Sequence, residues 1–250
     1  GDIVGDDENA VALATSEVVR LANTRVGEGF VAVSPEARKK FWLDRSRTAA
    51  IARHTNAFKI NEDVVIPLNR MGEYTDGIER INVELSIKNK LQLVEELHAY
   101  FTSGNLEVTK ADDATGEGVS KEEILGDRAQ QADELLARVA ARWGWITANL
   151  DLPLGDVLGK LGEFGLDGFA GTFQARLAQQ PGAKLFDVVQ DHTVRISWKN
   201  EIRAPLRQIF NGAAYKPILD EATAIHKRVL RSRVFVALHM HAGDGNVHTN

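Results

Sequence analysis

Residues 234–248, VFVALHMHAGDGNVH, contain the pattern that decides the fold of the C-terminal part of the chain. The first eight residues are mostly apolar or β-branched and predict a strand over 234–241. Residues 243–246 combine glycine, aspartate and asparagine, which are residue types that form tight turns. A second strand is predicted to begin at Val247, so that the whole run forms a β-hairpin.

Three of the seven histidines lie in this hairpin, at positions 239, 241 and 248. Strand alternation places His239 and His241 on one face, and a tight turn can bring His248 back beside His241. Imidazole is a common ligand of zinc, manganese and iron, so two imidazoles from facing strands could form a metal site. Asp244 and Asn246 would then orient the ligands or stabilise the turn. The alternative interpretation is a plain hairpin turn flanked by solvated histidines.

The rest of the chain predicts alternating helices and strands up to about residue 100 and an almost wholly helical stretch after it. Strands are predicted over 30–33 and 62–67, and glycines at every third position from 159 to 171 indicate short helices with glycine turns. Ser34-Pro35 and the capping box Ser120–Glu123 indicate helix starts. Helices are predicted over 9–24, 35–54, 68–101 (with a break near Gly72), 120–150, 186–210 and 217–231.

These elements predict an α+β fold. Strands near 30, 64, 237 and 248 would form an antiparallel sheet covered by helices. The stretch 101–233, which contains a polar linker at 111–118, is predicted to be an all-helical insertion. It separates the two parts of the domain that holds the predicted sheet, 1–100 and 234–250.

Composition excludes several classes of function. Of the 250 residues, 44% are hydrophobic and 26% are charged, and the net charge of -5 is spread along the chain, so no basic surface suggests nucleic acid. No apolar stretch approaches the roughly 20 residues that span a bilayer, and the start lacks the features of a signal peptide. The absence of cysteine excludes thiolate zinc and iron–sulfur sites within these residues and is compatible with the cytoplasm. We also expect a fragment of a longer polypeptide, because both ends lie inside predicted structure.

A binuclear metallohydrolase of the metallo-β-lactamase type is a weaker interpretation. Such enzymes use a His-x-His-x-Asp-His motif, and His239-Met240-His241 begins in that way. However, Asp244 falls one position late and Gly245 stands where a second histidine is needed. The sequence therefore lacks the residues that would hold a second metal.

Residues 241–248 reproduce in full the motif His-x-Gly-Asp-Gly-Asn-x-His. Upstream, the chain has Trp42-x-x-Arg45 and then Lys59 before an extended segment, 62–67, of the form Glu-Asp-Val-x-x-Pro. In these three features it resembles the C-terminal cap domain of FAD-linked oxidases related to D-lactate dehydrogenase, the glycolate oxidase subunit and D-2-hydroxyglutarate dehydrogenase. The resemblance covers about 1–100 and 234–250 and implies a ferredoxin-like cap domain.

The resemblance implies a flavin-dependent oxidoreductase acting on a D-2-hydroxy acid. It implies that His241 and His248 bind a divalent metal (Zn, Mn or Fe), and that a glutamate ligand and the catalytic base lie beyond Asn250. It assigns Arg45 and Lys59 to the substrate carboxylate, Trp42 to the pocket wall, and Gly245 and Asn246 to the cofactor side. FAD would be bound mainly by a preceding domain of the same polypeptide.

Further partners would be an electron-acceptor protein or a second copy of the chain, in the cytoplasm or at the inner face of a membrane. Taken without the resemblance, Arg45 is one of several surface cations in a basic stretch. The alternative function is a non-catalytic binding or assembly module centred on 101–233. His239 is interpreted as a strand residue and not a third ligand. Isolated surface histidines and packing tryptophans are expected at His54, His98, His192, His226, Trp143, Trp145 and Trp198.

Overall fold

The computed structural model describes residues 3–25, 27–48, 62–109, 120–241 and 245–249. The side chains at 44–48, 62–63, 239, 241 and 248–249 lie outside this description, as do the predicted linker 111–118 and the end of the helix predicted to reach His54. The chain forms two compact units, Gly1–Thr55 and Asn56–Asn250, and each is described here by itself. No helix among the described residues is both long and apolar enough to cross a membrane.

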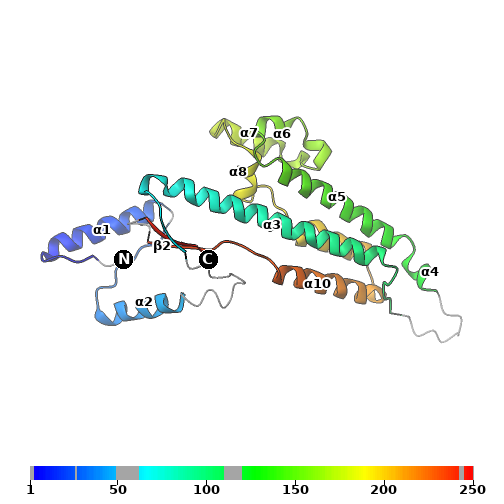
Figure 1. The fold of residues 1–250 in the computed structure, drawn as a ribbon, viewed down its shortest axis with the longest axis horizontal. Helices are drawn as coiled ribbons and strands as arrows, with labels where there is room; N and C mark the ends of the chain where they lie inside the picture. The colour runs from blue at the N-terminus through cyan, green and yellow to red at the C-terminus, as the bar shows by residue number, and fades with distance from the viewer. Residues whose placement is uncertain (1–2, 26, 49–61, 110–119, 242–244, 250) are drawn as a thin grey trace. The chain divides into compact units, whose positions relative to one another are not determined.

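The described residues of the first unit form two helices, α1 (Glu8–Thr24) and α2 (Pro35–Thr48) (Figure 1). α2 begins where Ser34-Pro35 predicts, and α1 begins one residue before its predicted start at residue 9. The Asp7 carboxylate accepts a hydrogen bond from the Asn9 N–H at 2.9 Å, and the Ser34 hydroxyl accepts one from the Ala37 N–H at 3.1 Å. α1 buries none of its residues.

The strand predicted over 30–33 was wrong. This segment has no regular structure, and its Phe30 ring lies against the Phe41 ring of α2 with a centroid distance of 5.4 Å. Val33 is 80% exposed. An apolar run becomes a strand only where a second strand accepts its backbone hydrogen bonds, and no strand is described in this unit.

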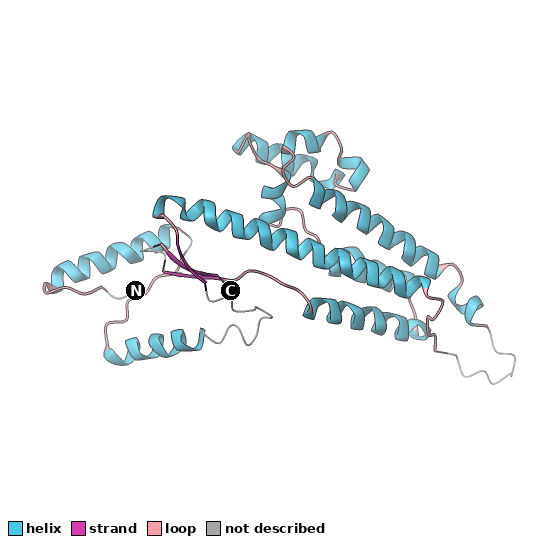
Figure 2. Ribbon diagram, viewed as in Figure 1, coloured by secondary structure: helices cyan, strands magenta, loops and turns pink. Residues whose placement is uncertain are grey.

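The second unit contains a small antiparallel sheet of three described strands, β1 (Glu62–Val65), β2 (Leu238–His241) and β3 (Asn246–Thr249). Their order is β1-β3-β2, so the last strand lies between the other two. Figure 2 shows the strands in magenta. β2 is shorter than predicted, because 234–237 approaches the sheet as an irregular segment. Helices and one small sheet together fit the α+β class. The ferredoxin-like arrangement of the cap stays a prediction.

A single long helix, α3 (Met71–Thr102), connects the sheet to the helical part of the unit (Figure 1). It follows a short 3-10 turn, η2 (Leu68–Arg70), and has no break near Gly72. The buried residues of α3 all lie in its second half, from Ile87 onward. The first half of α3 therefore leads from the sheet, and the second half enters the hydrophobic core.

The core lies where α3 packs against α5 (Arg128–Ala148), α10 (Lys216–Arg231) and α8 (Leu185–Gln190). Trp143, Phe173 and Phe210 are the largest fully buried side chains. The expected packing role of Trp143 and Trp145 holds, since Trp145 stacks on Phe164 at 4.1 Å. The remaining helical segments are α4 (Lys121–Leu125), α6 (Leu154–Leu158), η3 (Leu161–Phe164), η4 (Asp167–Phe169), α7 (Ala170–Gln179), η5 (Trp198–Arg203, a π-helix), α9 (Ala204–Ile209) and η6 (Ala213–Tyr215).

Two predicted long helices are divided in the structure. The capping box at Ser120 is present, with Ser120–Glu123 hydrogen bonds of 3.0 and 3.2 Å, but the helix ends at Leu125, directly before Gly126, whose φ is 51°. The helix predicted over 186–210 is interrupted after α8, where the Asp191 carboxylate accepts a hydrogen bond from the Thr193 N–H at 2.9 Å. Hydrogen bonds of this kind, between a side chain and the nearby backbone, compete with the backbone hydrogen bonds of a helix. The spacing of apolar residues gives no sign of them.

A network of charges joins α3 to the loop after α5. The Arg80 guanidinium binds both oxygens of the Asp151 carboxylate at 2.7 Å, and Lys184 approaches the same carboxylate at 3.3 Å. Mainly through the Arg80 contact, the pKa of Asp151 is lowered from 3.8 to about 2.

This network predicts an acid-sensitive contribution to stability. A carboxyl whose pKa is lower in the folded state stabilises the fold above its unfolded pKa and loses this effect as the pH falls toward the folded value. We therefore expect Asp151→Asn to reduce the decrease in Tm between pH 4 and pH 2. Asp156→Asn is the control, because among the described residues this exposed carboxylate forms no ion pair. Equal decreases in Tm for the wild type and Asp151→Asn would contradict the prediction.

Candidate functional site

The strand register decides which residues of the hairpin can act together. His241 pairs with Asn246, and His239 pairs with His248. Because directly paired residues share a face and alternate positions repeat it, all four belong to one face of the sheet. Asp63 of β1, paired with His248, belongs to the same face. The hairpin is confirmed, but the residue opposite His241 is Asn246 and not His248.

The two motif histidines are therefore diagonal neighbours across β2 and β3. Diagonal positions in an antiparallel pair have Cα atoms about 7–8 Å apart, a span that two imidazole rings can bridge toward one cation. By register, His241, His248, Asn246 and Asp63 occupy positions on this face, and histidine nitrogen with amide or carboxylate oxygen is a ligand combination that divalent zinc, manganese or iron accepts. Among the described side chains, no group of three or more ligating residues is found, and those of the three histidines lie outside the description.

The opposite face holds the hairpin in place. Val247 is fully buried, with no exposed surface, and pairs with Met240 on one side and Val64 on the other. The segment entering β2 is bound to α3 by Asn82, whose amide donates to the Val236 carbonyl at 2.8 Å and accepts from the Val236 N–H at 2.7 Å. Sequence reasoning missed Asn82, because an asparagine inside a helix carries no local sign of a partner 154 residues away.

Gly245 has a structural role that explains its place in the motif. Its φ is 76°, and a Cβ atom there would lie 2.2 Å from the Ile66 carbonyl oxygen. The Gly245 carbonyl accepts a hydrogen bond from the Ile66 N–H at 2.9 Å. Glycine is needed because the two backbones approach so closely that no side chain fits between them. The predicted cofactor roles of Gly245 and Asn246 stay predictions.

Two of the predicted substrate residues, Trp42 and Arg45, lie in the first unit. Trp42 is in α2 and is half exposed, and Arg45 follows it three positions later on the same helix. The side chain of Arg45 and the whole of Lys59 lie outside the described residues. Their assignment to a substrate carboxylate therefore stays a prediction.

The histidines outside the hairpin have different surroundings from one another. His98 is exposed on α3 and forms an ion-pair contact with Asp133. His192 was predicted to lie in a helix, but it lies in a turn with a φ of 63°. His226 on α10 stacks on Trp198 with a centroid distance of 4.5 Å. His54 lies outside the described residues.

The chain matches a known protein family. Residues 2–142, more than half of the chain, match the family described as FAD linked oxidases, C-terminal domain. The match includes α1, α2, β1, α3 and most of α5, and it ends before the hairpin. No curated protein and no solved structure matches the chain significantly.

Proposed function

The chain belongs to the family of C-terminal domains of FAD-linked oxidases, and on this basis we propose that it forms the substrate side of a flavin-dependent oxidoreductase that oxidises a D-2-hydroxy acid. The family itself makes the protein a flavin-dependent oxidoreductase. The hydroxy-acid substrate and a divalent metal held by His241 and His248 are our proposal.

The observation that supports the metal site is the strand register. His241 and His248 share one face of the sheet, and the buried Val247 and the close approach at Gly245 hold the backbone of 245–247 in place. A rigid backbone is what a ligand pair needs to keep its separation. When bound, the metal supplies Lewis acidity toward the substrate hydroxyl and FAD supplies the hydride acceptor.

The chain's own residues would bind and orient the substrate. The guanidinium of Arg45 can hold a carboxylate through two parallel hydrogen bonds, with Lys59 as a second contact. Trp42, three positions before Arg45, would line the carboxylate site and exclude water from it. The backbone at Gly245 and Asn246 would face the flavin.

The surface of the first unit supports a role as a docking domain. α1 buries no residue, and large apolar side chains are exposed on both of its helices and between them. Such surface is costly in water unless another domain covers it. We propose that the flavin-binding domain of the same polypeptide covers these residues, which include Leu13, Val18, Phe30, Phe41 and Leu43.

The experiment that tests the substrate role is Arg45→Gln in the FAD-bound holoenzyme. Loss of a charge-assisted contact to a carboxylate costs about 1.5–3 kcal/mol, so the KM for the accepted acid among D-lactate, glycolate and D-2-hydroxyglutarate should rise about 10- to 100-fold. Lys40→Gln on α2 is the control, because position 40 is exposed on a different side of the helix. An unchanged KM in Arg45→Gln would refute the assignment.

A further inference from the structure

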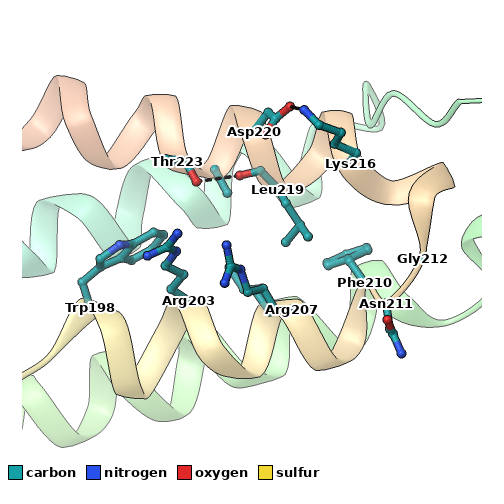
Figure 3. A pocket seen from close by; sticks show the side chains of 12 residues that line it. Trp198, Arg203, Arg207, Phe210, Asn211, Gly212, Lys216, Leu219, Asp220 and Thr223 are labelled. Carbon is teal, nitrogen blue, oxygen red and sulfur yellow. Dashed lines mark hydrogen bonds and ion pairs between the residues drawn. The ribbon is translucent and has the colours of Figure 1, made fainter.

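A hollow of about 510 Å³ lies between the η5–α9 segment and α10 (Figure 3). Trp198 stands at one end, and the connection Phe210–Gly212 stands at the other. The wall formed by α10 is apolar where Leu219 and Ala222 line it. The volume is within the range of about 300–1,000 Å³ that is usual for small-molecule sites.

Two guanidinium groups point into this hollow. Arg203 and Arg207 are one helical turn apart, and Figure 3 shows both side chains directed from the η5–α9 segment toward α10. Within the described part of the chain, neither forms a hydrogen bond or an ion pair. Asp220, which also lines the hollow, is bound to Lys216, and the Thr223 hydroxyl donates to the Leu219 carbonyl. The two arginines thus form an unneutralised pair of cations.

Trp198 also lines a smaller hollow of about 100 Å³. Lys90, His226 and Arg233 line it. Burial lowers the pKa of Lys90; the negative charge of Glu201 opposes this shift, and the positive charge of Arg233 adds to it less strongly. Burial, and then the charge of Arg203, lowers the pKa of His226. Glu201 itself is engaged by the Trp143 indole, the Ser197 N–H and Arg142.

We propose that the hollow between η5–α9 and α10 binds a small organic anion through Arg203 and Arg207. The ligand would carry carboxylate or phosphate groups, which match the paired donors of guanidinium, and an apolar part against Leu219 and Ala222. A small molecule fits better than an acidic protein segment, because Trp198 and the Phe210–Gly212 connection bound the hollow at both ends. The residues that line this hollow include none of the residues given a role in the proposed oxidation, so the proposal does not depend on it.

The test is a titration of the full chain with citrate, succinate, inorganic phosphate and a hexaglutamate peptide. Binding is followed by the NMR signal of the Trp198 indole N–H. We expect a small anion to shift this signal at millimolar concentration or below. Arg207→Gln should weaken binding about 10- to 100-fold, the factor expected for a lost charge-assisted contact.

Arg138→Gln is the matched control, since Arg138 is an exposed arginine of α5 outside the hollow. It should leave the affinity within about twofold. Arg207 is exposed, so its replacement is not expected to unfold the protein, and an unchanged Tm verifies this. The proposal is overturned if no small anion shifts the Trp198 signal, if Arg207→Gln and Arg138→Gln act alike, or if only hexaglutamate binds, which would indicate a protein partner.

Discussion

Replacing His241 by alanine in the FAD-bound enzyme is expected to remove the divalent metal and to lower kcat/KM by about a thousandfold or more, while FAD stays bound. The proposed metal lowers the barrier by several kcal/mol, and each 1.36 kcal/mol corresponds to about a factor of ten in rate. His248→Ala should have the same effect, because both histidines belong to one face of the hairpin and neither can hold the cation alone.

Metal content by mass spectrometry, flavin absorbance and steady-state kinetics together check this result. His98→Ala is the control, since His98 is an exposed histidine on α3 that bonds Asp133. His239→Ala is expected to retain the metal, although His239 pairs directly with His248. Full metal content and activity in His241→Ala would remove the basis of the proposed site, and metal loss in His239→Ala would make His239 a third ligand.

Gly245→Ala is expected to destabilise the sheet by about 3 kcal/mol or more. A positive φ costs a residue with a Cβ roughly 1–2 kcal/mol, and the clash with the Ile66 carbonyl adds to this cost because the Cβ would lie 2.2 Å from the oxygen. The damage should be local. The Ile66 amide, which donates to the Gly245 carbonyl, should lose protection from hydrogen exchange, while the amides of α3 and α5 keep theirs.

Gly144→Ala provides the matched control for this prediction. Gly144 lies inside α5, and a Cβ atom there would meet no heavy atom within 4 Å. Alanine should therefore stabilise the helix by about 0.5–1 kcal/mol. Urea unfolding measures the change in both variants. A Gly245→Ala protein as stable as the wild type, with the Ile66 amide still protected, would contradict the role given to Gly245.

The candidate site was partly predictable from sequence. The motif at 241–248 identified the hairpin and the two histidines, and strand alternation placed His239 and His241 on one face. The pairing partner of His241 was not predictable, because it depends on how many residues the turn uses. Asn82 and the cationic pair Arg203–Arg207 carry no motif. Their surroundings come from elements that are distant in the chain.

The sequence by itself determined where α2 and α4 begin, because the caps Ser34 and Ser120 act within three residues of their partners. It also determined that the chain ends in a hairpin, since glycine-rich turn chemistry is local. Only the tertiary structure decided that β3 is the central strand and that 30–33 forms no strand. It also decided that the backbone of Ile66 packs closely against Gly245. The physical reason is that strand pairing forms backbone hydrogen bonds between segments that are far apart in the chain, here Glu62–Val65 and Asn246–Thr249. The residue types within one strand do not specify which other segment will pair with it.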